Sequence, residues 1–200
     1  MIKKNLLSIL GLIASSLLIL FYCINIIGFL AFNRTFSWML IFNTLSPFLL
    51  IIIFLTLRHI LVNISRLYNF KILLTLLIIF QTLILLLMLG FKFQVVTTKI
   101  LTIPFMLSGF IVIILTIWFF ISVSYISKNE VTGLSFLQLY AISALLVLLL
   151  SIVPEILIFL KKGDSQSLDI IRNIAVIVPY IFLSIFFLKS LLHDNNPDVN

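Results

Sequence analysis

Residues 5–33 are NLLSILGLIASSLLILFYCINIIGFLAFN, a stretch of 29 residues without a charged side chain. A helix rises about 1.5 Å per residue, so about 20 apolar residues cross the roughly 30 Å hydrocarbon core of a membrane. This stretch is therefore long enough to span a bilayer. Lys3 and Lys4 precede it, and the large residues before Cys23 do not suit a cleavage site, so the sequence predicts an uncleaved signal anchor.

Five more charge-free stretches follow along the chain. They are residues 35–57, 72–91, 100–127, 131–154 and 173–188, with 23, 20, 28, 24 and 16 residues. The first four can span outright, and the last can if the long side chain of Lys189 reaches the membrane surface. We expect helices near residues 6–32, 36–57, 72–90, 100–126, 134–160 and 170–192. The predicted fold class is all-α, a polytopic integral membrane protein with six transmembrane helices in one bundle.

The amino-acid composition also indicates that the chain lies in a lipid bilayer. The chain is 63% hydrophobic and only 10% charged, whereas soluble domains are about a quarter charged. Six spans in 200 residues leave only short connections. We therefore expect one transmembrane domain over residues 1–192 and a short polar tail over residues 193–200.

The longest connection, residues 58–71, alternates polar and apolar side chains. This spacing suits a short amphipathic helix on the membrane surface. The alternative is that the preceding helix simply continues and frays.

The formal net charge of +7 is carried by residues near the ends of the predicted helices. No basic stripe alternates with stacking aromatics, so nucleic acid is not an expected partner, and membrane lipids are. Seven of the Lys and Arg residues lie on one predicted side and six on the other. Lys3, Lys4 and the charges of residues 58–71 favour cytoplasmic termini. The composition suggests a bacterial inner membrane.

The first predicted helix carries a stripe of small and polar residues at helical spacing, interrupted by Leu18. The stripe is Ser8, Gly11, Ser15, Tyr22 and Asn25. Small residues allow close helix approach and polar ones bond across helices, so the stripe should pack against protein. Similar contacts are expected from Thr75, Gln81 and Thr82, from Tyr140, Ala144, Ser151 and Glu155, and from Asn173, Tyr180 and Ser184.

Glu155 is the only acidic residue well inside a predicted span. A carboxylate there is costly, and two interpretations remain open. It pairs with Arg172 near the membrane surface, or it serves a proton relay or cation site whose polar neighbours are Ser151, Asn173 and Tyr180. Prolines 47, 104, 154 and 179 lie in four of the helices, where kinks can shape a cavity.

The sequence offers little catalytic chemistry. It has one cysteine, two histidines outside the apolar stretches, no aspartate within a span and no glycine-rich phosphate loop. Nucleophilic catalysis, a multi-ligand metal site and nucleotide-driven transport all need such groups. We expect no enzyme activity and no cofactor.

By elimination, the sequence favours a non-catalytic subunit or accessory protein of a larger membrane assembly, for transport, export or envelope maintenance. Its partners would be other integral membrane proteins or further copies of itself. A small permease or carrier using Glu155 is one alternative, and a lipid-binding or lipid-modifying protein is another. A polar cavity reaching Glu155 would favour the carrier, and a lateral opening the size of a lipid headgroup would favour the lipid function.

Overall fold

The computed structural model describes the backbone of residues 2–32, 39–92, 98–126, 131–159 and 165–195. Within these ranges, side chains are described for residues 6–28, 45–90, 102–126, 131–148 and 174–192.

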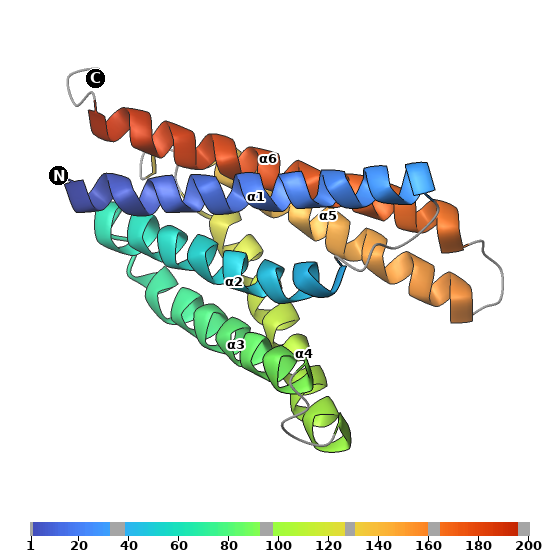
Figure 1. Cartoon of the computed structure of the whole chain (residues 1–200). Helices are drawn as coiled ribbons and strands as arrows, with labels where there is room; N and C mark the ends of the chain where they lie inside the picture. Colours follow the sequence, from blue (N-terminus) through green and yellow to red (C-terminus); the bar gives the residue numbers. More distant parts are fainter. Residues whose placement is uncertain (1, 33–38, 93–97, 127–130, 160–164, 196–200) are drawn as a thin grey trace.

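The described backbone is helical and contains no strand. Six α-helices follow one another: α1 (Ile2–Phe32), α2 (Met39–Arg58), α3 (Asn69–Lys92), α4 (Thr98–Ser124), α5 (Leu134–Phe159) and α6 (Ser165–Asn195) (Figure 1). A short π-helix, η1 (His59–Ile64), continues from α2. The predicted all-α fold is confirmed, because long charge-free runs leave the backbone no partners in lipid other than its own helical carbonyls. The last helix runs to Asn195, into the segment expected to be a tail.

The membrane character of the helices is also confirmed. Five segments are long and apolar enough to cross a bilayer, namely Leu6–Gly28, Leu45–Ile64, Asn69–Gly90, Thr102–Ser124 and Ile174–Leu192. In α5 the described side chains cover the apolar segment Leu134–Leu148, while its backbone helix has 26 residues. The chain is a membrane protein built from several apolar helices.

The helices form a closed ring of neighbours. Each packs against the next in sequence, and α6 packs against α1 more extensively than any other pair packs. The start of α1 and the end of α6 lie at the same end of the bundle (Figure 1). The contact between α4 and α5 is the smallest between consecutive α-helices, and the α3–α4 hairpin diverges from α5 and α6.

The connection between α2 and α3 is not a separate surface helix. The helix continues as η1, whose residues Ile60, Leu61 and Val62 are buried. The amide of Ser65 donates to the Ile60 carbonyl at 2.9 Å, and Arg66 then turns the chain with a φ of 57°. Of the two expectations, continuation of the helix is the one observed. It packs into the core because its three central side chains are all apolar.

Candidate functional site

The small and polar stripe of α1 lies against α2 and α6. Its residues Ser8, Gly11, Ser15 and Leu18 are buried, and Tyr22 and Asn25 are partly buried. The Thr56 Oγ1 atom of α2 is 3.1 Å from the Leu7 carbonyl oxygen and 2.9 Å from that of Ile52, so its hydroxyl can donate to either helix. A Cβ at Gly11 would lie 2.7 Å from Thr56 Cγ2 and 3.0 Å from the Phe187 ring. The absence of a side chain at Gly11 is what allows these three helices to meet.

At the interface between α1 and α6, which we call the seam, a serine contacts a serine and a tyrosine contacts a tyrosine. The Ser184 hydroxyl donates to Ser15 Oγ at 2.7 Å, and the Ser15 hydroxyl donates to the Leu12 carbonyl at 3.0 Å. The rings of Tyr22 and Tyr180 stack with centroids 6.0 Å apart and an interplanar angle of 13°. Each serine finds a partner that lipid cannot supply. The seam therefore fixes α6, and with it Tyr180, relative to α1.

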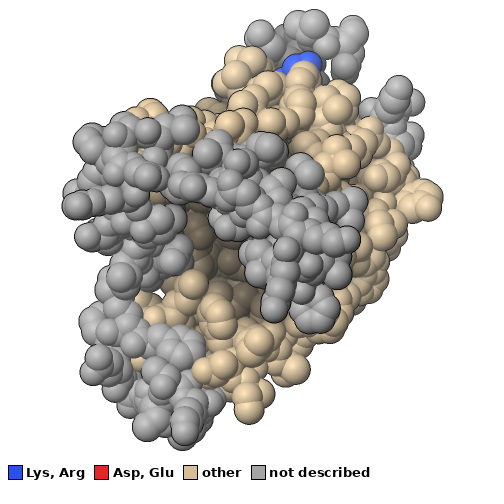
Figure 2. Space-filling model, turned by 90° about the vertical axis from the view of Figure 1, so that its right-hand side faces the viewer, with Lys and Arg blue, Asp and Glu red and all other residues tan. Residues whose placement is uncertain are grey.

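A cavity of about 220 Å³ lies inside the ring, is lined by residues of α2, α3, α4, α5 and α6, and is partly open to the outside. Its walls are largely apolar, formed by Leu50, Phe54, Val112, Phe120, Ala144, Val147, Leu148, Val176 and Pro179. Four uncharged polar residues complete the lining, one from each of α3 to α6: Gln81, Thr116, Tyr140 and Tyr180. Viewed from the end of the bundle where α2, α4 and α6 begin, the surface is hollowed in its middle, and the described residues there are uncharged (Figure 2). We call this space the central cavity.

The polar groups of the central cavity are not paired with one another. The Gln81 side chain is 5% exposed, and its amide makes no hydrogen bond within the described part of the chain. The hydroxyls of Thr116, Tyr140 and Tyr180 make none there either, although the Tyr140 ring packs edge-on to Phe120 at 5.6 Å. Their polar atoms are accessible from the cavity, since none of them is among the fully buried side-chain atoms without a partner in the described part of the chain. The cavity thus offers unmet hydrogen-bonding capacity inside an apolar wall.

The lining also sets limits on what the central cavity can hold. No lining residue is charged, and bringing an ion to membrane depth without a counter-charge is costly. The volume of about 220 Å³ is below the roughly 300–1,000 Å³ of typical ligand pockets. Among the described side chains, no group of three His, Cys, Asp or Glu could hold a metal ion. These features suit a small neutral molecule.

Most of the predicted intramembrane polar site lies outside the described side chains. This applies to Ser151, Glu155, Arg172 and Asn173. Tyr180 is the described member, and it lines the central cavity. In the backbone of α5, Glu155 comes seven residues after the lining residue Leu148, about 10 Å further along the helix axis. The Glu155–Arg172 ion pair and the relay both stay predictions.

The sequence identified several cavity residues but gave them another role. Gln81, Tyr140 and Ala144 were expected to form helix contacts, and all three also line the central cavity. Thr116 was missed, and its only signal is a single hydroxyl within the apolar run of residues 110–121.

Thr75 and Thr82 were expected to form internal contacts of the bundle, but the hydrogen bonds of their hydroxyls are not between helices. Their hydroxyls donate within α3, to the carbonyls of Lys71 at 2.6 Å and Ile78 at 2.7 Å. A threonine hydroxyl can reach the carbonyl four residues earlier in its own helix, so it needs no neighbouring helix.

Comparison with models of protein families, with curated proteins and with solved structures found no match to this chain. Function is therefore inferred from the geometry and chemistry of the residues themselves.

Proposed function

We propose that the protein is a non-catalytic membrane protein that binds a small, neutral, mostly apolar molecule in the central cavity. The observation that carries this proposal is Gln81. Its side chain is 5% exposed, lines the cavity and makes no hydrogen bond to the described residues. An occupant with a hydrogen-bonding group would satisfy that amide, whereas the apolar wall would hold the rest of the occupant.

The lining indicates the chemical class of the occupant. An amide both donates and accepts, and so do the hydroxyls of Thr116, Tyr140 and Tyr180. A carbonyl, ester or hydroxyl group on the ligand can therefore bind there without carrying charge. The leucine, valine and phenylalanine side chains suit a hydrocarbon remainder. This combination describes a small lipid-like molecule taken from the membrane interior.

Two features of the cavity wall support ligand exchange with the membrane. Pro179 lies in the wall and in the middle of α6, and proline removes the amide that would donate to the Ala175 carbonyl. The neighbouring α4–α5 contact is the smallest between consecutive α-helices. Because α6 is weakened at Pro179 and the α4–α5 interface is small, the cavity wall can open sideways toward the membrane here. A carrier or a ligand-binding subunit requires such an opening.

A matched pair of variants on α5 tests this function. Ala144 lines the cavity, whereas Ile142 is exposed on the outer side of the same helix. Ala144→Phe should fill the cavity, and Ile142→Phe should leave it unchanged. Each protein is purified in mild detergent, its mass is measured by native mass spectrometry, and its organic-solvent extract is analysed by mass spectrometry. We expect one discrete neutral compound with the wild type and Ile142→Phe, and its loss with Ala144→Phe.

The role of the amide is tested separately with Gln81→Leu, which keeps the approximate side-chain size. Retention of the compound should fall roughly fivefold, because one hydrogen bond worth about 1 kcal/mol is lost. Equal amounts of the compound in the wild type, Ala144→Phe and Gln81→Leu would contradict the proposal. So would a wild-type extract that holds nothing beyond bulk phospholipid and detergent.

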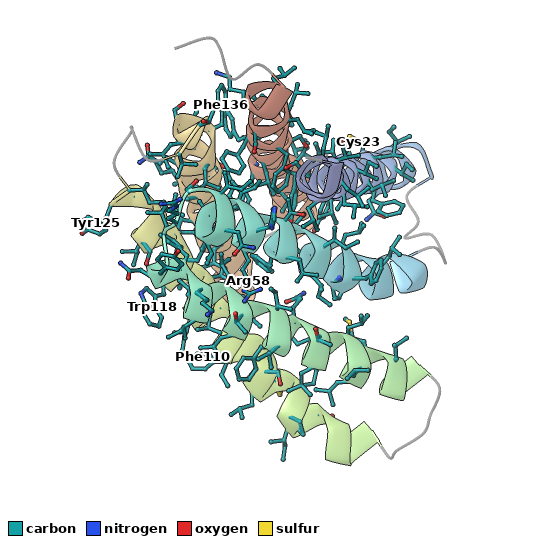
Figure 3. The ribbon with its side chains drawn as sticks, turned by 90° about the vertical axis from the view of Figure 1, so that its left-hand side faces the viewer. Cys23, Arg58, Phe110, Trp118, Tyr125 and Phe136 are labelled. Carbon is teal, nitrogen blue, oxygen red and sulfur yellow. The ribbon has the colours of Figure 1, made fainter. Side chains whose placement is uncertain are left out.

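The outer face of α4 favours a second candidate, the subunit of a larger membrane assembly. Six exposed residues of α4 and Tyr125 directly after it, spaced three or four apart, form one face: Ile103, Leu107, Phe110, Ile114, Trp118, Ile121 and Tyr125. Figure 3 shows Phe110, Trp118 and Tyr125 on this outer side of the bundle. Aromatic side chains are enriched at protein interfaces. Gentle extraction and native mass measurement should reveal a stoichiometric protein partner if this candidate is right, and a bare monomer would contradict it.

A further inference from the structure

A second cavity, which we call the basic groove, lies between the end of α2 and the start of α3. Its volume is about 290 Å³, and its lining is Arg58, Lys71, Ile72, Thr75 and Leu76. It shares no lining residue with the central cavity. Figure 3 shows Arg58 between the two helices. The groove therefore needs its own explanation.

The basic groove has two cations and no described anion to balance them. None of the described side chains, in the five ranges given above, is an aspartate or glutamate. The Arg58 Nε atom is buried and makes no hydrogen bond to the described residues. A guanidinium and an ammonium group together suit a phosphate, because both donate charge-assisted hydrogen bonds to its oxygens. The unused Nε donor shows that the described part of the chain does not satisfy this arginine on its own.

Aromatic residues place the groove at the level of lipid headgroups. Tyr68 lies between η1 and α3, and Tyr125 lies directly after α4, both at the end of the bundle that holds the groove. Their side chains are 67% and 85% exposed, respectively. Tyrosines in this situation typically anchor a protein at the boundary between lipid and water. All four cations with described side chains, Arg58, Arg66, Lys71 and Lys189, lie at this end as well. A phosphate in the basic groove would therefore sit at headgroup depth.

An apolar path leads from the groove toward the membrane interior. On α3 the exposed residues Ile72, Ile79, Leu83 and Leu86 are spaced seven, four and three apart, so they share one helix face. Ile72 belongs both to this face and to the groove. We infer that the basic groove binds the phosphate of an anionic phospholipid, whose acyl chains lie along this face of α3. Basic pockets between membrane helices bind anionic headgroups for the same electrostatic reason.

The test compares Lys71→Gln and the double variant Arg58→Gln/Lys71→Gln with wild type. Arg66→Gln is the matched control, because Arg66 is an exposed cation at the same end but outside the groove. Each full-length protein in detergent is titrated with phosphatidylglycerol or with phosphatidylcholine of identical chains, and bound lipid is counted by native mass spectrometry. A single cation near the surface contributes about fivefold in affinity.

We expect phosphatidylglycerol to bind about fivefold more weakly to Lys71→Gln and about 30-fold more weakly to the double variant. Arg66→Gln should bind like wild type, and phosphatidylcholine should bind weakly to all four proteins. Equal weakening by Arg66→Gln would overturn the inference, since it would indicate general surface charge. Equal binding of both lipids would overturn it too. If inorganic phosphate protects wild type against heat as well as phosphatidylglycerol does, the ligand is free phosphate and the lipid assignment is wrong.

Discussion

Replacing Gly11 with alanine tests the junction of α1, α2 and α6. The new Cβ would lie 2.7 Å from Thr56 Cγ2 and 3.0 Å from two atoms of the Phe187 ring. Both distances are well inside van der Waals contact, and Phe187 is fully buried, so neither neighbour can move freely. We expect Gly11→Ala to separate the helices slightly and to destabilise the fold.

The size of this effect follows from two opposing contributions. Overpacking a buried site by one methyl group costs about 1–3 kcal/mol. Alanine recovers up to about 1 kcal/mol over glycine through its higher helix propensity. The net loss should be about 1 kcal/mol, which lowers the Tm of a chain of this length by about 2–4 °C. Gly109→Ala is the control, because a Cβ there meets nothing within 4 Å.

The assay is thermal unfolding in one detergent, followed by far-ultraviolet circular dichroism. Gly11→Ala should unfold at lower temperature than wild type, and Gly109→Ala should not. Adding Thr56→Ser removes the Cγ2 atom but keeps the hydroxyl, which lies 3.1 Å from the Leu7 carbonyl oxygen. The free energy of unfolding of the double variant should therefore be at least about 0.5 kcal/mol higher than the value obtained by adding the effects of the two single substitutions. Strict additivity, or an unchanged Tm for Gly11→Ala, would refute this account of the junction.

Two further substitutions are expected to change stability. Ser184→Ala removes the hydroxyl that donates to Ser15 Oγ, so the free energy of unfolding should fall by about 0.6 kcal/mol. Ser124→Ala is the control, because the Ser124 hydroxyl donates within α4 to the Phe120 carbonyl at 3.2 Å. An equal loss of stability in both variants would show that the bond between Ser184 and Ser15 adds nothing. Gly133 has a φ of 76°, where alanine costs about 1–2 kcal/mol. The Tm of Gly133→Asn should decrease less than that of Gly133→Ala, because asparagine tolerates this conformation.

The helices could be predicted from the sequence because one physical effect dominates. Charged side chains are excluded from the bilayer core, so the positions of Arg58, Lys71 and Lys92 alone mark the ends of two helices to within a few residues. Burial of Ser8, Gly11 and Ser15 in α1 follows the small and polar stripe for a similar reason.

The central cavity could not be predicted in this way. Whether Gln81 and Tyr140 fill a contact or line a space depends on the angle between α3 and α5, which no local pattern encodes. The packing of α6 on α1 is equally non-local, because the contacting residues Ser15 and Ser184 are 169 positions apart. The π-helical continuation of α2 depends on burial of Ile60, Leu61 and Val62, which the alternating pattern of residues 58–71 does not reveal.

The return of α6 to α1 closes the ring around the cavity, and disulfide cross-linking tests it most directly. Cys23 is first replaced by serine, which removes the one native cysteine. Cysteines are then introduced at positions 15 and 184, whose hydroxyl oxygens lie 2.7 Å apart. Cysteines at positions 15 and 113 serve as the control, because Ile113 is exposed on α4, which makes no extensive contact with α1 in the described part of the chain. Mild oxidation in native membranes should cross-link the first pair within one chain and leave the control pair reduced. A control pair that cross-links as readily as the first, or a first pair that stays reduced, would contradict the closed ring.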